Sequence, residues 1–327
     1  MEWLALTTAL AVCAVSTVVA EAAPQRPVRI ALLSDTHVRT NPTGDHAAYR
    51  DRLLQAIAQV REMKPDVTLF AGDLTENGSP EDFATFQTLA SGLRRPVLWV
   101  PGNHDVGGKR LPGKDAGVTE ESVAAYERLL GPSFGARTAG GARVIFLNAS
   151  LLGSGLPAEA RQWVLLERET ARKGGAPKVI LLHNPPFLQE PGEKGGDYWT
   201  VEPEPRARLL ELARKGGVRA ILSGHIHRPL RNDVAGVACI TTPPISFGLP
   251  SAVQPEGWTQ VEIATDGSVT AEEVEIREAG AAGRRDPAPG AAAAYLTLMN
   301  SSLERAQTGQ SVGALPLYVE PQTGQTK

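Results

Sequence analysis

The segment IALLSDTH, residues 30–37, passes from an apolar run directly into serine, aspartate, threonine and histidine. The apolar half is typical of a buried β-strand, and the polar half begins where that strand must end. Ligands in open α/β sheets bind outside the carboxyl ends of the strands. Asp35 and His37 are therefore candidates for a functional site, although a surface turn would explain these two residues taken alone.

Four later segments repeat this arrangement of an apolar run followed by polar residues. They are FAGDL at 70–74, VPGNHD at 100–105, LLHN at 181–184 and LSGHIH at 222–227. Five of the six histidines of the chain lie in these five segments, and only His46 lies outside them. Each segment alone fits a capped turn or a core histidine, but their joint occurrence at successive strand ends favours one shared site.

The side chains in these segments have the chemistry of metal ligands. Carboxylate and amide oxygens mixed with imidazole nitrogens suit Mn, Fe or Zn ions. Two cations held a few Å apart need about eight ligand contacts, and seven side chains supply them if one carboxylate is shared. Glycines at 72, 102 and 224 precede ligands, as tight turns close to an ion require. The candidate ligands are Asp35, His37, Asp73, Asn103, His183, His225 and His227.

The pattern of apolar residues predicts an α/β fold. The expected buried strands cover residues 28–34, 66–71, 96–100, 143–148, 178–182 and 218–223. Amphipathic helices are expected at 48–62, 80–91 and 157–173, the second capped by Ser79 with Pro80 in its first position. Further strands at 236–241, 257–264 and 268–276 without helices between them predict an antiparallel or mixed portion at the end.

The two ends of the chain differ from this middle part. Residues 3–20 carry no charge and precede an A-x-A-like site, which predicts a signal peptide over 1–22 and a secreted or periplasmic protein. The usual positive residues are missing, so an uncleaved N-terminal anchor remains the alternative. Residues 277–294 are a low-complexity linker, and 295–327 form a tail with a possible short helix at 295–307. Signal removal leaves Cys239, expected to be a buried, inert thiol.

The order D-x-H, G-D, G-N-H-D, a single H and G-H-x-H resembles the calcineurin-like metallophosphoesterase superfamily over about residues 28–276. The Asp35-Thr36-His37 opening resembles its cyclic-nucleotide phosphodiesterase-like branch. Purple acid phosphatases carry a further tyrosine ligand where His37 stands here, so no iron–tyrosinate centre is expected. The resemblance implies a four-layer αββα sandwich, in which two packed mixed sheets are flanked by helices and the metal site lies at the carboxyl ends of the strands.

The resemblance also implies a role for each residue. A hydroxide bridging the two ions is expected to attack phosphorus in line, while His104 assists the leaving group and Asp105 orients His104. The implied metal ligands are Asp35, His37 and His227 for the first ion, Asp73 as the bridge, and Asn103, His183 and His225 for the second.

Composition narrows the possible functions. A formal net charge of −3 without a basic stripe gives no case for a nucleic-acid partner, and it disfavours a nuclease. Contents of 42% hydrophobic and 21% charged residues are ordinary for a globular protein, and no membrane contact is expected beyond the N-terminal segment. The sequence therefore predicts a dinuclear hydrolase of phosphate esters, with monoesters and diesters both open. The alternative is a non-catalytic metal-binding or interaction module that retains the fold.

Three features near the predicted site have two explanations each. Tyr198 and Trp199, in a long loop at 186–200, either stack on a substrate or pack the loop down. The stretch 107–117 is interpreted as a plain loop rather than a phosphate-attracting one. Arg39 and His46 are interpreted as part of a solvated loop rather than as substrate contacts.

Overall fold

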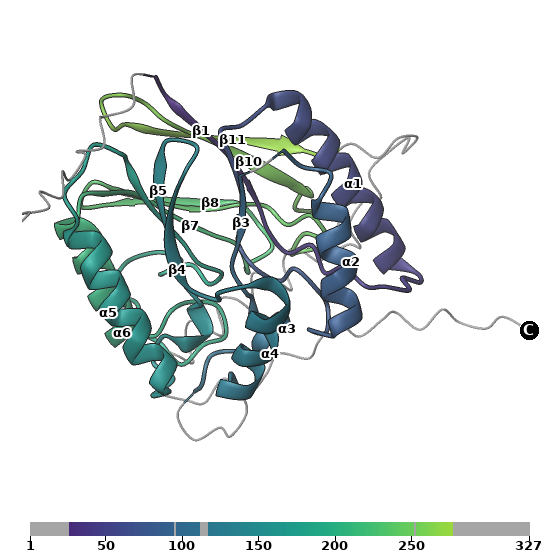
Figure 1. Cartoon of the computed structure of the whole chain (residues 1–327), viewed down its shortest axis with the longest axis horizontal. Coiled ribbons are helices and arrows are strands. Elements are labelled where there is room, and N and C mark those ends of the chain that lie inside the picture. The colour runs from purple at the N-terminus through teal and green to yellow at the C-terminus, as the bar shows by residue number, and fades with distance from the viewer. Residues whose placement is uncertain (1–25, 95, 112–116, 252, 277–327) are drawn as a thin grey trace, which may run out of the picture.

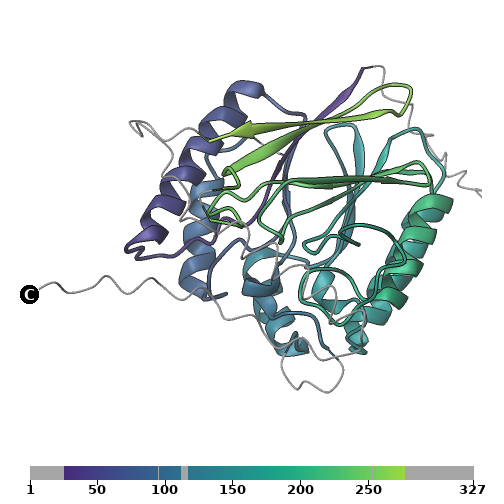
Figure 2. The ribbon, with the colours of Figure 1, turned by 180° about the vertical axis from the view of Figure 1, so that it is seen from behind.

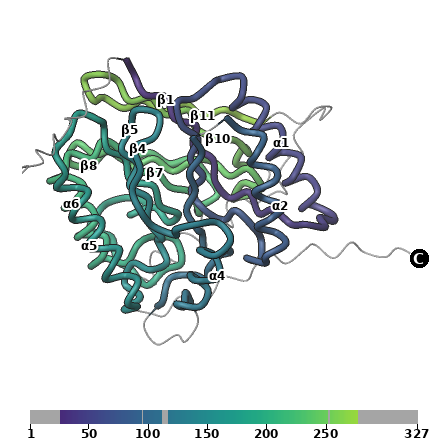
Figure 3. The backbone as a smooth tube through the Cα atoms, in the orientation of Figure 1, coloured from purple at the N-terminus to yellow at the C-terminus, as the bar shows by residue number. Residues whose placement is uncertain are grey.

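Two mixed β-sheets lie face to face, and helices cover the outer face of each. The computed structural model describes residues 26–94, 96–111, 117–251 and 253–276. Figure 1 shows α1 (Asp45–Met63) and α2 (Pro80–Ala90) on one side of the strands, and α5 (Pro157–Ala171) and α6 (Pro203–Lys215) on the other. Figures 2 and 3 show the same order from behind and as a backbone tube. The predicted four-layer αββα sandwich is confirmed.

The first sheet has the strand order β11-β10-β1-β2-β3. Strands β1, β2 and β3 are parallel, whereas β10 runs antiparallel to β1 and β11 antiparallel to β10. Of the three strands predicted to form an antiparallel or mixed portion, those at 257–264 and 268–276 extend the sheet in which the chain began, and the one at 236–241 joins the second sheet. The strand bounds are β1 Val28–Leu33, β2 Val67–Phe70, β3 Val97–Trp99, β10 Gly257–Ile263 and β11 Val269–Glu275.

The second sheet has the strand order β4-β5-β6-β7-β9-β8. Strands β5, β6, β7 and β9 are parallel, and β4 and β8 close the two edges in antiparallel fashion. The parallel strands of both sheets thus end near the same border of the sandwich. The strand bounds are β4 Gly135–Ala139, β5 Ala142–Phe146, β6 Lys178–Leu181, β7 Val218–Ser223, β8 Leu230–Val234 and β9 Val237–Thr241.

Three layers of apolar side chains hold these elements together. The central layer lies between the sheets, where Ile30 and Leu32 of β1 meet Val179 of β6 and Leu222 of β7. One outer layer joins the first sheet to α1, α2 and α4 (Glu120–Leu130), and the other joins the second sheet to α5 and α6. Because the central strands are covered on both faces, they read as continuous apolar runs in the sequence.

The longer elements not predicted from the sequence are β4, β8, α4 and α6, and only the two edge strands among them have weak local signals. Strand β8 is LRNDV, a half-exposed edge strand with charged residues, and β4 is the small-residue segment GARTA. Helix α4 starts with a capping box in which Thr119 Oγ1 accepts from Ser122 N at 3.0 Å. The Ser79 cap of α2 is confirmed, since its Oγ accepts from Asp82 N at 3.1 Å. Two short helical turns complete the fold, α3 (Asn103–Val106) and η1 (Ala149–Leu151).

The predictions for the two ends of the chain lie outside the described residues. These are the signal peptide or anchor at 1–22, the linker at 277–294 and the tail at 295–327. Among the described residues, no helix combines the length and the apolar character that crossing a bilayer would take. Cys239, in β9, is buried, and burial raises the pKa of its thiol to about 12, as expected for an inert residue.

Tyr126 offers a test of core packing. Its ring is fully buried in α4 and packs edge-on against Phe83, but its hydroxyl has no hydrogen-bond partner within the described part of the chain. A buried hydroxyl left unpaired costs about 1–3 kcal/mol. We therefore expect Tyr126→Phe to raise the free energy of unfolding by about 1 kcal/mol, measured by urea denaturation. A clear loss of stability would show that the hydroxyl has a partner.

Candidate metal centre

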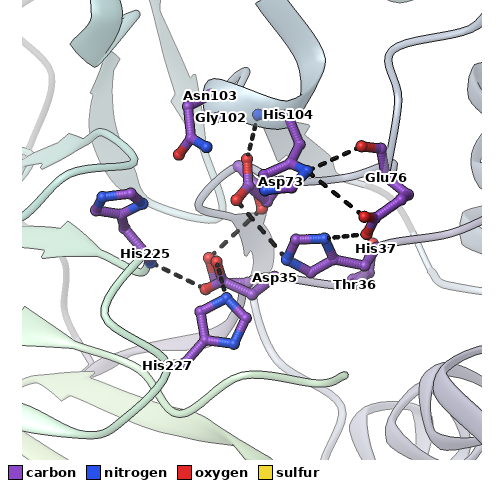
Figure 4. A network of polar contacts seen from close by, with 12 residues as sticks. Asp35, Thr36, His37, Asp73, Glu76, Gly102, Asn103, His104, His225 and His227 are labelled. Atoms are coloured by element: carbon purple, nitrogen blue, oxygen red, sulfur yellow. Dashed lines mark hydrogen bonds and ion pairs between the residues drawn. The ribbon is translucent and has the colours of Figure 1, made fainter. Parts of the chain in front are cut away.

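The seven candidate ligands meet at the border where the parallel strands of both sheets end. Those from the first sheet follow β1, β2 and β3, and those from the second follow β6 and β7. Figure 4 shows the side chains of Asp35, His37, Asp73 and His227 directed towards one another, with the backbone N–H of His225 bound to Asp35 and its ring to one side of them. The prediction that residues far apart in the chain converge at one edge is confirmed, with the addition that both sheets contribute.

Among the described residues, two groups of potential ligand atoms share Asp73, and a third consists of His37, Glu76 and His104. In the first group, the ligand atoms of Asp35, His37, Asp73 and His227 all lie within 4.8 Å of one another, and the second group of Asp73, His183 and His225 meets the same limit. All these side chains are buried. Two adjoining clusters with one common carboxylate match the arrangement expected for a pair of cations.

Asp73 is shared through a single oxygen atom. Its Oδ2 lies 3.7 Å from His37 Nε2 in the first group and 3.3 Å from His183 Nε2 in the second. Its other oxygen, Oδ1, accepts a hydrogen bond from the backbone N–H of His104 at 2.9 Å. This division leaves Oδ2 positioned as a bridging ligand while Oδ1 anchors the carboxylate.

Every histidine of the two groups uses its second ring nitrogen to contact an oxygen atom. Such a contact makes that nitrogen the N–H donor and leaves the inward nitrogen as an acceptor with a free lone pair. Hydrogen-bonded partners of this kind orient most metal-binding histidines in proteins. The contacts are His37 Nδ1 to Glu76 Oε2 at 2.8 Å, His183 Nδ1 to Ala71 O at 2.7 Å, His225 Nε2 to Tyr198 O at 3.1 Å and His227 Nδ1 to Phe247 O at 2.6 Å.

When these histidines are neutral, their inward nitrogens are therefore acceptors that face other acceptors. His183 Nε2 lies 3.1 Å from both His225 Nδ1 and Asn103 Oδ1. In the first group, Asp35 Oδ1 and His37 Nε2 are buried and have no hydrogen-bond partner among the described residues. Lone pairs packed against one another repel unless a cation lies between them. The donor set of carboxylate, amide and imidazole atoms thus fits a site for divalent metal ions.

Burial and neighbouring charges shift the pKa values of the cluster residues strongly. Burial lowers the pKa of His183, but the charge of Asp73 outweighs this effect and raises the pKa to about 9. Burial raises the pKa of Asp73, yet the charge of His183 holds it well below its usual range. Burial, reinforced by the charge of His183, lowers the pKa of His225. A proton on His183 lies between acceptor atoms of neighbouring side chains. A metal cation bound at the site would take a similar position.

The backbone at the ligands is bent into the left-handed region, which L-residues rarely adopt. Seven non-glycine residues of the described chain have a positive φ, and five of them are candidate ligands. Unusual backbone conformations persist where surrounding contacts hold them, and they concentrate at functional sites. The five are Asp35 (53°), His37 (45°), Asp73 (46°), His225 (73°) and His227 (52°).

Two glycines make this close packing possible. Gly72 has a φ of 91°, and a Cβ atom there would lie 2.6 Å from His183 Nδ1. A Cβ atom at Gly102 would overlap the backbone nitrogen and the carboxylate of Asp73. Only glycine permits the segments after β2 and β3 to approach this closely, which agrees with the expectation from the sequence.

A family model described as calcineurin-like phosphoesterase matches residues 28–229. The match covers well over half of the chain and includes the two ligand groups together with Asn103 and His104. The chain belongs to the calcineurin-like phosphoesterase family. The resemblance stated from the five motifs is confirmed.

Curated relatives place the chain near several phosphoesterases. It is 30% identical to a "probable cyclic nucleotide phosphodiesterase" of Rhodococcus erythropolis, over 63% of this chain and 66% of that protein. It is 29% identical to a cAMP/cGMP dual specificity phosphodiesterase of Mycobacterium tuberculosis, over 63% of each chain. It is also 29% identical to a serine/threonine-protein phosphatase of Bos taurus, over 53% of this chain and 58% of that one. The chain thus spans slightly less than two thirds of the length of these three relatives.

Solved structures share the fold at low sequence identity. A purple acid phosphatase from yellow lupin, Lupinus luteus, superimposes with a TM-score of 0.55 and 15% identity, over 77% of this chain and 52% of that one. The structure of PhoD gives a TM-score of 0.53 and 10% identity, over 89% of this chain and 79% of that one. At these identities the likeness concerns the fold of the phosphoesterase family alone.

The structure corrects the expectation that Asp105 orients His104. Asp105 is buried, and its two oxygens accept from the backbone N–H groups of Leu74, Thr75 and Gly102 and from Thr75 Oγ1, at 2.8–3.0 Å. The ring of His104 instead contacts the backbone carbonyl oxygen of Glu76 through Nδ1 at 2.8 Å. Asp105 therefore joins the loops after β2 and β3, because its short side chain points into the turn rather than to the ring.

Glu76 is a residue of the candidate site that the sequence did not reveal. Its carboxylate accepts from His37 Nδ1 at 2.8 Å and lies 3.9 Å from His104 Nδ1, as Figure 4 shows. Arg39 and His46, interpreted as a solvated loop, reach the same carboxylate at 3.8 and 3.6 Å. The only available signal was an acidic residue three positions after Asp73, and nothing local showed that it would face His37.

The lowered pKa of Glu76 predicts that the stability of the protein depends measurably on pH. Burial raises the pKa of its carboxyl group, but the hydrogen bond and charge of His37 outweigh this and lower the pKa from 4.5 to about 2. A folded-state pKa below the unfolded one gives stability that is present above pH 4.5 and lost as the pH falls towards 2. For metal-free protein, we expect the free energy of unfolding to fall less steeply between about pH 5 and 2 in Glu76→Gln than in the wild type.

Urea denaturation at several pH values in that range gives the free energy of unfolding of both proteins, and from it the slope of this free energy against pH for each. Glu273→Gln, on the exposed face of β11, is the matched control for loss of a carboxylate. Parallel slopes for Glu76→Gln and the wild type would contradict the ion pair with His37.

The two aromatic residues of the 186–200 loop behave differently. Trp199 is 7% exposed and packs with Leu188 and Ile226, so it holds the loop down. Tyr198 is 45% exposed, and its ring lies against the ring of His225 with centroids 4.7 Å apart. Trp199 therefore packs the loop down, whereas Tyr198 lies beside a candidate ligand and its stacking on a substrate stays a prediction.

Proposed function

We propose that the chain is a metal-dependent hydrolase of phosphate esters that uses two metal ions. The observation that carries this proposal is the set of inward-facing acceptor atoms, in which Asp73 Oδ2 lies between His37 Nε2 and His183 Nε2. When bound, two cations would lower the pKa of water towards about 7 and neutralise charge on the phosphoryl oxygens. Membership of the calcineurin-like phosphoesterase family supports the same reaction class.

The chain's own residues would hold and orient this pair. Asp35, His37 and His227 would hold the first ion, and Asn103, His183 and His225 the second, with Asp73 shared. Because backbone carbonyls and Glu76 fix the outer ring nitrogens, the inward lone pairs are oriented before metal or substrate arrives.

His104 is the group best placed to assist the leaving oxygen. Its ring stands edge-on to that of His37, with centroids 4.6 Å apart, and is 25% exposed. Since Nδ1 donates to the carbonyl oxygen of Glu76, Nε2 remains to carry a proton to the substrate.

We place phosphodiesters, and among them cyclic nucleotides, first in the order of candidate substrates. The support is that two of the relatives described above are named as cyclic nucleotide phosphodiesterases. Phosphomonoesters, including phosphoproteins, are the second candidate, supported by the bovine relative named as a protein phosphatase. Mn, Fe and Zn remain the proposed metals, because each accepts mixed oxygen and imidazole ligands.

The test combines metal analysis with a small panel of substrates. Purified protein is reconstituted with Mn, Fe or Zn, its metal content is measured by elemental analysis, and hydrolysis of bis(4-nitrophenyl) phosphate, 4-nitrophenyl phosphate and 3′,5′-cAMP is followed. We expect two ions per chain and turnover of the diesters. Two bound ions with no turnover of any ester would favour the non-catalytic metal-binding module instead. Absence of bound metal would contradict the site itself.

We also propose that the protein is exported, as a secreted or periplasmic enzyme. The support is the uncharged stretch 3–20 followed by Ala20-Glu21-Ala22. Cell fractionation with N-terminal sequencing of the mature protein tests this. A new N-terminus directly after Ala22 is expected, whereas an intact N-terminus in the membrane fraction would favour the anchor.

A further inference from the structure

Tyr198 contacts two of the candidate ligands of the second ion. Its hydroxyl oxygen accepts a hydrogen bond from Asn103 Nδ2 at 2.8 Å. Its backbone carbonyl oxygen accepts from His225 Nε2 at 3.1 Å, and its ring covers the ring of His225. One residue of the loop before α6 thus touches the outer sides of Asn103 and His225, which come from different sheets.

The contact with Asn103 satisfies the outer end of the amide when its oxygen faces the metal centre. An asparagine side chain offers an acceptor oxygen and a donor NH₂ group of nearly the same shape. Here Oδ1 lies 3.1 Å from His183 Nε2, while Nδ2 points to Tyr198. If the amide turned over, an N–H group would face the ion and the ligand would be lost. In the productive orientation the NH₂ group faces outward, and the hydroxyl oxygen of Tyr198 accepts its hydrogen bond and so stabilises that orientation.

The loop that carries Tyr198 is itself fixed. The carboxylate of Asp197 accepts from the backbone N–H groups of Trp199 and Thr200 at 2.8 and 3.1 Å. The ammonium group of Lys109 donates to Glu202 Oε1 at 2.6 Å and to the carbonyl oxygen of Thr200, and its side chain is only 7% exposed. Since Lys109 follows Asn103 by six residues, the segment carrying the ligand is tied to the segment carrying Tyr198.

We propose that Tyr198 is a positioning residue for the second metal ion, and that its hydroxyl holds the amide of Asn103 with the oxygen towards the ion. This inference rests on the proposed dinuclear function. It goes further by assigning a role to a residue outside the ligand set, and by predicting that the two ions respond differently to one substitution. The first group contains no residue that contacts Tyr198, so its ion should be unaffected.

Tyr198→Phe is the decisive variant, because it removes the hydroxyl and keeps both the ring over His225 and the backbone carbonyl. Mn²⁺ binding to the metal-free protein is followed by isothermal titration calorimetry. We expect the affinity for one ion to fall about 10–100-fold while the affinity for the other stays unchanged, as for other outer partners of metal ligands. The exchange-coupled Mn–Mn signal in electron paramagnetic resonance should disappear at metal concentrations that still load the wild type.

Activity at saturating Mn²⁺ distinguishes a positioning role of Tyr198 from a direct contact of Tyr198 with the substrate. If Tyr198 acts through Asn103, excess metal should restore kcat of Tyr198→Phe to within about threefold of wild type. A kcat that stays low with both ions bound would overturn the proposal in favour of direct action on the substrate. Unchanged affinity for both ions, or equal loss of both, would also overturn it.

Tyr126→Phe is the matched control. It also removes a tyrosine hydroxyl, but from the core, where the described residues offer that hydroxyl no partner. It should bind both ions as the wild type does. A wild type that binds two ions but hydrolyses no ester would contradict the proposed function and leave the binding test of Tyr198 intact. A wild type without a second ion would overturn both.

Discussion

Asp73→Asn is expected to prevent binding of both metal ions and to lower kcat/KM by about 10³-fold or more, the upper end of the loss for one electrostatic stabiliser. The carboxylate is the only side chain that belongs to both ligand groups. Its Oδ2 would be replaced by an NH₂ group that cannot bind a cation and that faces His37 Nε2 and His183 Nε2. Elemental analysis after dialysis and ester hydrolysis measure the two effects.

The fold should survive this substitution. The oxygen that accepts from the backbone N–H of His104 is retained in asparagine, so the loop after β3 keeps its contact. Asp233→Asn, which removes a 60% exposed carboxylate from edge strand β8, is the control and should retain both ions and full activity. Full metal occupancy in a folded Asp73→Asn protein would contradict the bridging role.

His104→Ala should lower kcat by roughly 10²–10⁴-fold, the usual contribution of a general acid, while the metal content stays at the wild-type level. The ring lies beside the ligand groups, and the backbone N–H that anchors Asp73 remains in alanine. A loss of metal together with activity would show that His104 is a ligand or a support of one.

The leaving group provides a sharper test of the same residue. Esters of 4-nitrophenol release an anion that needs no proton, whereas alkyl esters release a basic alkoxide. The loss in His104→Ala should therefore be large for alkyl phosphodiesters and small for bis(4-nitrophenyl) phosphate. Equal losses on both substrates would mean that His104 binds the phosphoryl group instead of protonating the leaving oxygen.

Much of the fold was predictable because its central strands are buried on both faces. Their apolar runs ended within one or two residues of the observed strand ends, as for the predicted 28–34 against Val28–Leu33. The helix at 80–91 was marked by its own cap residues, Ser79 and Pro80. Edge strands such as β8 were missed because half of their residues face solvent and no apolar pattern remains.

The sequence by itself determined which residues form the candidate centre. Ligand chemistry is a property of single side chains, and a polar residue directly after a buried strand has few places to lie other than the sheet edge. For that reason Asp35, Asp73 and His183 were identifiable from five short motifs with no knowledge of their spatial neighbours.

Only the tertiary structure decided how those residues are held. Glu76, not Asp105, lies next to the ring of His104, and Tyr198 reaches Asn103 across 95 positions of the chain. These contacts depend on how two sheets and their loops pack, and each is a single long-range hydrogen bond that leaves no periodic or local signal in the sequence. The tautomers of the ligands and the left-handed backbone at five of them follow from that packing.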